Sequence, residues 1–496
     1  MEPVTAALIA VVILLVLLAI RTPVALGLII AGVVGLLLTD GFALAEVTLT
    51  RRSLEATGRY VLVVIPFFLA MGVLVKESGV AEDLFRFGQR MFRRVPGGLA
   101  VATIFACAAF GAVSGSSVAT VASIGRVAIQ EMRKLGYRIS VAAGAVSVSG
   151  TLSVMIPPSI ALVLYGIVTG ESIGELLIAA IVPGVITAAA YILVVIVRAL
   201  LRPAAFRPAP VAAAAGSGTT PVPVAGGATP AAGEVATSSP SGSGATAAPS
   251  PGASRTGTAT AGSRPATTSG TAPLPAFRYR SLVETVILVV IVMGGIYTGL
   301  ATVVEAASLG AVVALCMLLL RRPEASTRLR KLRNALLETT QLNAMIFLLL
   351  VGSGIFSYML VSAGIPRETS RFVGSLDVPP VVLVIALLAI FIPLGMFLDP
   401  IAMLVIAVPL TYPIAVTELG FDGIWYGILV VKMAELALIT PPLGLNVFVI
   451  AGVAEGVTVE EAFAGSMWYV PVDFAVIALL FAFPGIVTWL PSLMLG

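Results

Sequence analysis

The sequence contains no histidine, only two cysteines and few charged residues. Without histidine, the chain cannot build a His-ligated zinc site or a Ser-His-Asp triad. Cys107 and Cys316 lie in apolar segments without metal-ligand spacing, so both are interpreted as packing residues. No GxxxxGK[ST] motif occurs, which excludes ATP bound at a P-loop of this chain.

Charged residues make up 11% of the chain, against about 25% in water-soluble domains. Hydrophobic residues make up 58%, and the mean hydropathy is +1.08. Apolar runs such as Val4–Ile20, Leu282–Tyr297 and Phe474–Trp489 approach the roughly 20 residues that cross a bilayer as a helix. We therefore predict an all-α polytopic protein of the inner (plasma) membrane. The basic residues lie between apolar spans, so the net charge of +4 indicates membrane topology and no nucleic-acid partner.

One segment interrupts the apolar pattern and divides the chain. Residues 203–277 are almost entirely Ala, Pro, Gly, Ser, Thr and Val, which cannot bury enough surface to offset the entropy of ordering. We predict a disordered cytoplasmic linker here, and a tolerated insertion is favoured over a docking or regulatory segment. The flanking parts, 1–202 and 278–496, are interpreted as two repeats. One offset aligns Gly111 with Gly395 and Pro157-Pro158 with Pro441-Pro442.

The orientation of the repeats is predicted from crossings and charge. Each half is interpreted as five crossings, because the two arms of a re-entrant hairpin enter and leave on one side, and an odd number inverts the second half. Cytoplasmic loops carry an excess of Lys and Arg. Placing both termini outside puts most of the 29 basic residues inside, including the clusters within 76–94, 126–138 and 321–333. The prediction is an N-out/C-out protein with two inverted-topology repeats.

Each half has a tight hairpin tip and a helix broken at Pro-Pro. The tips are Ser114-Gly115-Ser116-Ser117 and Phe397-Leu398-Asp399-Pro400, and their partner breaks span 150–159 and 437–446. A helix broken within a membrane leaves peptide groups unpaired, at a cost of several kcal/mol each unless protein, water or ions satisfy them. Freed carbonyl oxygens suit a small hard cation, and half-helix N-termini suit an anion. Such broken helices in inverted repeats are typical of secondary transporters.

Simpler interpretations stay open for these residues. The Ser-Gly-Ser tip could be a tight turn whose small residues allow close helix approach. Asp399 could cap a half-helix at Pro400 without binding an ion, although a carboxylate at membrane depth costs about 2.5–3.5 kcal/mol or more. Glu435 could pair with Lys432 near the outer surface.

The chain resembles the large, DctM-like membrane subunit of tripartite ATP-independent periplasmic (TRAP) transporters. The resemblance covers both halves and leaves out the linker. The segments that carry it are Gly111–Gly125, Ile156-Pro157-Pro158-Ser159, Leu398-Asp399-Pro400 and Ile439–Asn446. The chain departs from the family at Ser153 and Ala437, where the family usually has Gly.

The resemblance implies an elevator-type, sodium-coupled importer of organic acids such as carboxylates and sialic acids. It also implies two partners, a periplasmic substrate-binding protein that delivers the solute and a small four-span membrane subunit. The mobile transport parts are expected at about 98–170 and 379–455. The scaffold spans are expected at 1–75, 175–200, 281–360 and 466–490.

Carried over by position, the resemblance also implies two Na⁺ sites and a substrate site. The first Na⁺ site would use Ser114, Gly115, Ser116, Ser153, Ile156 and Pro158. The second would use Gly395, Asp399, Ala437, Thr440 and Pro442. Ser117, Ser159 and Asn446 would face the substrate.

Two other functions are alternatives to this interpretation. A stand-alone sodium- or proton-coupled anion symporter of similar hairpin architecture would need no binding protein. An intramembrane enzyme would need a paired acid and base, or a nucleophile, at membrane depth, and only Asp399 is convincingly placed. The sequence therefore favours a non-enzymatic transporter subunit.

Overall fold

The computed structural model describes residues 2–20, 22–206, 279–321, 325–375 and 378–495. Within these ranges the chain is helical, with no strand. The predicted linker lies outside the described residues except for its first four positions, where Pro203–Ala205 forms a short 3-10 helix, η2.

The first half of the chain forms eleven α-helices in its described residues. They are α1 (Pro3–Ala19), α2 (Val24–Thr39), α3 (Gly41–Thr57), α4 (Val64–Ser78), α5 (Val80–Met91), α6 (Gly98–Ser114), α7 (Ser117–Lys134), α8 (Ile139–Met155), α9 (Ile160–Thr169), α10 (Ile173–Ala179) and α11 (Ile181–Leu201), with the 3-10 turn η1 (Tyr60–Val63) before α4.

The second half continues from Tyr279. Its described elements are α12 (Tyr279–Val289), η3 (Val290–Gly294), α13 (Gly295–Tyr297), α14 (Val303–Leu320), α15 (Ala325–Ser362), α16 (Ile365–Ser375), α17 (Pro380–Phe397), α18 (Pro400–Tyr412), η4 (Pro413–Glu418), α19 (Gly423–Ala437), α20 (Leu445–Val453), α21 (Val459–Ser466), α22 (Val470–Ala482) and α23 (Gly485–Leu495).

Many of these helices match the dimensions of a bilayer. Among the described residues, seven are long and apolar enough to cross a membrane, and up to nine if each bent pair counts as one span. Leu, Val and Ile side chains remain exposed along several of them, for example Val185, Leu193, Val312 and Ile385. Such surfaces suit lipid and would be costly in water. The prediction of an all-α polytopic membrane protein is confirmed.

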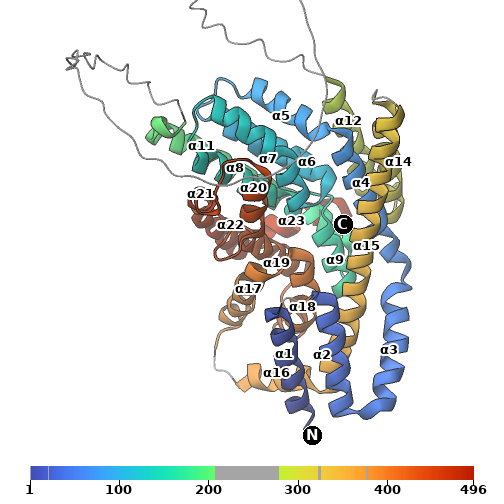
Figure 1. Ribbon diagram of the computed structural model, residues 1–496. Coiled ribbons are helices and arrows are strands. Elements are labelled where there is room, and N and C mark those ends of the chain that lie inside the picture. The colour runs from blue at the N-terminus through green and yellow to red at the C-terminus, as the bar shows by residue number, and fades with distance from the viewer. Residues whose placement is uncertain (1, 21, 207–278, 322–324, 376–377, 496) are drawn as a thin grey trace, which may run out of the picture. The chain divides into compact units, whose positions relative to one another are not determined.

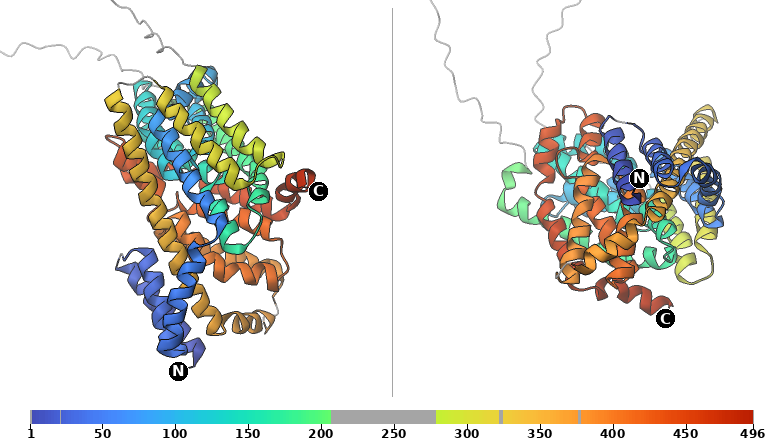
Figure 2. Two further views of the ribbon diagram at one scale, coloured as in Figure 1. Left: turned by 90° about the vertical axis from the view of Figure 1, so that its right-hand side faces the viewer. Right: turned by 90° about the horizontal axis from the view of Figure 1, so that it is seen from below.

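The helices pack in two groups that are visible in Figures 1 and 2. In one group, the long α15 lies against α2, α3 and α4, and α14 lies against α4. In the other, α8 is surrounded by α6, α7, α11 and α21, and α19 packs on α17, α18 and α22. Small residues permit the closest approaches: a Cβ on Gly465 of α21 would lie 1.8 Å from Ser140 O.

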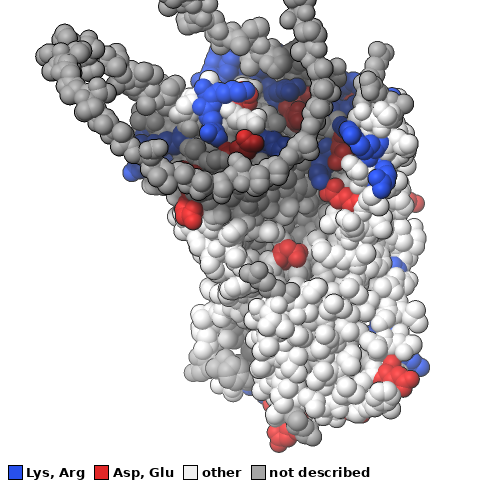
Figure 3. Space-filling view, in the orientation of Figure 1, with Lys and Arg blue, Asp and Glu red and all other residues white. Residues whose placement is uncertain are grey.

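Charge is distributed unevenly over the face shown in Figure 3. Lys and Arg gather toward the end where α5 and the first turns of α15 lie, and most of the surface below is uncharged. Arg321 links helices at this end, because its guanidinium lies 3.0 Å from Glu284 and 3.4 Å from Asp83. An uncharged band next to a basic end is the pattern expected for a membrane protein.

Candidate functional site

The first hairpin turns tightly at its predicted tip. Helix α6 ends at Ser114, Gly115 takes a left-handed conformation (φ +60°), and Ser116 caps α7 by accepting a hydrogen bond from Ala119 N at 3.4 Å. A Cβ on Gly115 would lie 3.0 Å from Pro158 O, so the tip rests directly on the Pro-Pro break. Glycine is required here both by the backbone angle and by the neighbouring carbonyl.

Three buried hydroxyl groups join this tip to α8. Thr120 Oγ1 lies 3.0 Å from Ser114 Oγ and 2.7 Å from Ser153 Oγ, and it donates to Ser116 O at 2.9 Å. The cluster therefore collects four oxygens from three elements, and hydroxyl and carbonyl oxygens are the ligands that hard cations take. Sequence reasoning assigned no role to Thr120, although it falls within the motif that begins at Gly111.

The first broken helix is interrupted at its proline pair, as predicted from the sequence. Helix α8 stops at Met155, and α9 starts at Ile160 with its axis bent by 41° from that of α8. Ser159 caps α9, accepting from Leu162 N at 3.4 Å, and it also donates to Val154 O. The hydroxyl of Ser159 therefore already takes part in hydrogen bonds within the break. Ile156, another predicted ligand, lies beside Gly184 of α11.

Asp399 lies at the second hairpin tip and caps α18. Its Oδ1 accepts hydrogen bonds from Ile401 N at 2.9 Å and Ala402 N at 3.1 Å. Asp399 Oδ1 therefore acts as the helix cap that the sequence allowed. Within the described part of the chain, Oδ2 has no hydrogen-bond partner, so one anionic oxygen is left for a ligand.

Two glycine contacts place each hairpin against its broken helix. A Cβ on Gly111 would lie 2.7 Å from Ser153 Cα, and one on Gly395 would lie 2.4 Å from Ala437 Cβ. Ser153 and Ala437 are both inside helices, where Ser and Ala adopt the backbone without strain. The glycines of α6 and α17 supply the space that Ser153 and Ala437 need at these contacts.

The second break is longer than the first. Residues 438–444 separate α19 from α20, Thr440 donates its hydroxyl to Leu436 O at 2.6 Å, and Gly444 takes φ +42°. Pro442 is exposed. Asn446 is buried and donates from Nδ2 to Ser147 O at 3.1 Å, whereas its Oδ1 has no partner among the described residues. Asn446 thus joins the second break to α8 of the first half.

Both hairpin tips open into one cavity of about 400 Å³, here called the tip cavity. Ser114 to Ser117 line it from the first half, and Asp399 lines it from the second. Lys76 of α4 and Glu338 of α15 also line it, and Lys76 Nζ lies 2.7 Å from Glu338 Oε1. Ser153, Ser159, Thr440, Pro442 and Asn446 are not among its lining residues.

Four helices start at this cavity. Its wall includes the first residues of α7 (Ser117), α9 (Ile160), α18 (Pro400) and α20 (Leu445). The N-terminus of a helix carries a partial positive charge and free N–H groups. Ser116, Ser159 and Asp399 already cap three of these ends, and Lys76 is paired with Glu338. The remaining N–H groups at the four ends are donors that suit a bound anion.

Lys432 of α19 lies at the centre of a second charged cluster. Its Nζ lies 2.7 Å from Glu435 Oε2 and 2.6 Å from Asp473 Oδ1 of α22, and Tyr191 of α11 donates to Asp473 at 2.7 Å. The three charged side chains are fully buried. The pairing of Lys432 with Glu435 was predicted, but burial beside Asp473 was not.

Gly395→Ala tests the packing of the second hairpin. The added methyl group would lie 2.4 Å from Ala437 Cβ, so we expect a loss of stability of about 1–3 kcal/mol, seen as a lower Tm of the purified protein. Gly452→Ala of α20 is the control, because a Cβ there meets nothing within 4 Å. Equal Tm values for the two variants would contradict the close contact.

The apolar spans, the interrupted helices and a cavity between two hairpin tips define a polytopic membrane transport protein. Residues 11–486 match the family model described as "Tripartite ATP-independent periplasmic transporter, DctM component". The chain belongs to this family, and it is therefore a TRAP transporter large permease, a multi-pass protein of the inner membrane and not an enzyme.

Individual relatives agree with the family match. The chain is 31% identical to the C4-dicarboxylate large permease DctM of Pseudomonas aeruginosa, over 89% of this chain and 87% of that protein. It is 25% identical to the sialic acid large permease SiaM of Vibrio cholerae, over 96% of each. Its fold is similar to the crystal structure of the Alcanivorax borkumensis YdaH transporter, with a TM-score of 0.58 at 14% identity, covering 91% of this chain and 90% of that one.

Proposed function

We propose that this permease imports an organic acid, and that the tip cavity binds the carboxylate of the solute. The observation that carries the proposal is the convergence of four helix N-termini on one cavity of about 400 Å³. C4-dicarboxylates and sialic acid, for which two relatives are named, both carry carboxylates. Ser117 lines the cavity and is the solute-facing hydroxyl of the first tip.

We further propose that Na⁺ drives this import from two sites beside the cavity. The first is built on the hydroxyl cluster of Ser114, Thr120 and Ser153, with the carbonyls of Ser116 and Pro158 close by. The second is built around Asp399, whose Oδ2 is free for a cation while Oδ1 holds the helix cap. Gly395 and Ala437 bring α17 and α19 together near the second tip, and carbonyls of the break at 437–442 supply the remaining oxygens.

An elevator movement of one helix group against the other fits the packing. The contacts Gly111–Ser153 and Gly395–Ala437 occur at corresponding positions of the two proposed inverted repeats. Residues 175–200 and 466–490 were predicted as scaffold, yet the buried cluster joins Tyr191 of α11 and Asp473 of α22 to α19. We therefore place α11 and α22 with the moving group, and α1–α4, α14 and α15 with the fixed group. The basic end seen in Figure 3 would face the cytoplasm, which is the N-out/C-out arrangement.

The family description is tripartite, so the permease is one component of a larger assembly. We propose that a periplasmic binding protein delivers the solute and that a small four-span subunit braces the fixed group. The isethionate relative of Oleidesulfovibrio alaskensis, named DctMQ, supports the second partner. The present chain covers only 64% of it, which leaves room for a fused small subunit.

Reconstituted uptake tests the proposal. Proteoliposomes that contain the permease and the small subunit, supplied with the binding protein and labelled succinate or N-acetylneuraminate, are expected to accumulate solute only under an inward Na⁺ gradient. Replacing Na⁺ by choline at constant pH should abolish accumulation. Uptake that persists in choline would contradict sodium coupling, and uptake without the binding protein would favour the stand-alone symporter.

A further inference from the structure

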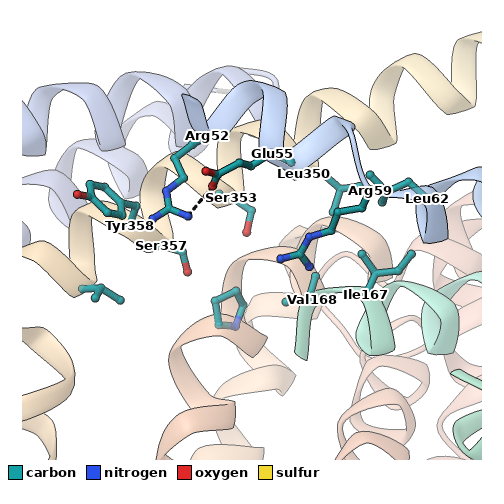
Figure 4. Close-up of a pocket in the computed structure, with 14 residues that line it drawn as sticks. Arg52, Glu55, Arg59, Leu62, Ile167, Val168, Leu350, Ser353, Ser357 and Tyr358 are labelled. Carbon is teal, nitrogen blue, oxygen red and sulfur yellow. Dashed lines mark hydrogen bonds and ion pairs between the residues drawn. The ribbon is translucent and has the colours of Figure 1, made fainter. Parts of the chain in front are cut away.

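A second cavity, of about 380 Å³, lies between the two helix groups. We call it the arginine cavity, after Arg52 and Arg59. Figure 4 shows both guanidinium groups entering from α3 and the turn after it, with Ser353, Ser357 and Tyr358 of α15 also at the cavity. The far wall is formed by the end of α9 and by Pro409 of α18.

The two arginines differ in their partners. Arg52 lies 2.8 Å from Glu55 Oε2, and its guanidinium lies 4.5 Å from the centre of the Tyr358 ring. These contacts orient Arg52 and neutralise part of its charge. Arg59 is exposed and has no ion pair or hydrogen bond to the described residues, so its five N–H donors are available to a ligand. The lining thus has one positive charge in excess, together with three hydroxyl groups.

The arginine cavity and the tip cavity share three helices. Helices α9, α15 and α18 line the tip cavity at Ile160, Glu338 and Pro400, and the arginine cavity farther along at Ile167, Ser353 and Pro409. Along α15, Ile346 of the tip cavity and Leu350 of the arginine cavity are roughly 6 Å apart at 1.5 Å per residue. The two cavities therefore lie near opposite ends of α9 and α18 and along successive turns of α15.

A hydrogen bond joins α15 and α18 beside the arginine cavity. Pro409 has no N–H, which leaves the carbonyl of Val405, four residues earlier, without its helical donor. Ser353 donates its hydroxyl to Val405 O at 2.7 Å and satisfies it. This contact joins a helix of the proposed fixed group to a helix of the proposed moving group beside the arginine cavity.

We propose that the arginine cavity is a second binding site for the carboxylate of the transported acid, at the opposite end of the route from the tip cavity. Arg59 would bind the carboxylate with two parallel N–H donors, and Ser357 would donate to it from α15. Arg52 would contribute once the ligand competes with Glu55. The inference rests on the proposed function, because it takes the ligand to be the solute.

Ligand protection of a cysteine measures occupancy without transport. Ser357→Cys, with Cys316→Ser to remove the exposed native thiol, is made in the full-length chain and placed in nanodiscs of phosphatidylcholine, which excludes anionic lipid. Succinate at constant ionic strength should slow modification of residue 357 by a charged maleimide at least about threefold. Val361→Cys, also in the lining, is a second reporter in case the first variant folds poorly.

Charge variants then locate the ligand. Arg59→Gln and Arg52→Gln should each raise the succinate concentration for half-protection about tenfold, through loss of a charge-assisted hydrogen bond. Glu55→Gln should lower the succinate concentration for half-protection, because loss of the Glu55 carboxylate frees Arg52 to bind the ligand. Arg51→Gln is the matched control: Arg51 lies on α3 next to Arg52 but outside the cavity lining, so this variant should behave as wild type.

Three results would overturn the proposal. The first is that succinate does not protect the cysteine. The second is that Arg59→Gln and Arg51→Gln change the succinate concentration for half-protection equally. The third is that protection appears only with anionic lipid. Failure of the proposed function is seen separately, as absent uptake in proteoliposomes with protection by succinate intact. Loss of protection with sodium-driven uptake intact would instead remove the arginine cavity alone.

Discussion

Replacing Asp399 by Asn is expected to raise the Na⁺ concentration for half-maximal uptake at least about tenfold, since loss of even an outer-shell partner costs roughly 10- to 100-fold in metal affinity. Asn caps helices as well as Asp does, so the hydrogen bonds to Ile401 N and Ala402 N should survive. What the variant lacks is the negative charge on Oδ2. Initial uptake rates in proteoliposomes, measured against Na⁺ concentration, give the result.

Asp422→Asn is the matched control. Asp422 is also an N-cap, since it accepts from Trp425 N at 2.7 Å at the start of α19, but it does not line the tip cavity. Both variants lose one charge and keep one cap. If the sodium dependence of uptake changes equally in the two, the charge of Asp399 has no special role, and the second Na⁺ site must be built elsewhere.

The elements that could be predicted from the sequence are those set by local chemistry. A proline pair interrupts a helix whatever its tertiary contacts are. The breaks after Met155 and Ala437 could therefore be predicted from composition and position alone. The Ser-Gly-Ser tip and the cap at Asp399 are equally local. Apolar runs of bilayer length made the membrane class evident.

Residues that depend on distant partners could not be found in this way. Thr120 matters because Ser153 lies against it, and Lys76 because Glu338 reaches the same cavity from α15. Neither pairing has a sequence signature. The same holds for Asp473, which looks like an isolated acidic residue until α22 packs on α19. Helix packing, more than helix formation, therefore decides which polar residues form the site.

Lys432→Met should destabilise the protein severely. Lys432 is fully buried and is the counter-charge within 2.7 Å for both Glu435 and Asp473. Its removal leaves two buried carboxylates together, and breaking a buried pair in this way costs about 3–5 kcal/mol. We expect poor recovery of folded protein and a large drop in Tm, measured by fluorescence-detected chromatography of heated, detergent-solubilised samples.

Lys134→Met isolates burial as the cause. Lys134 lies 2.6 Å from Glu131 with the same three-residue spacing, but its side chain is 68% exposed, so its loss should cost under about 1 kcal/mol. The triple variant Lys432→Met, Glu435→Gln, Asp473→Asn removes the buried charges together and should recover much of the lost Tm. A single Lys432→Met variant as stable as Lys134→Met would contradict the buried ion cluster. It would also remove the main reason to place α11 and α22 with the moving helices, because this cluster is what ties them to α19.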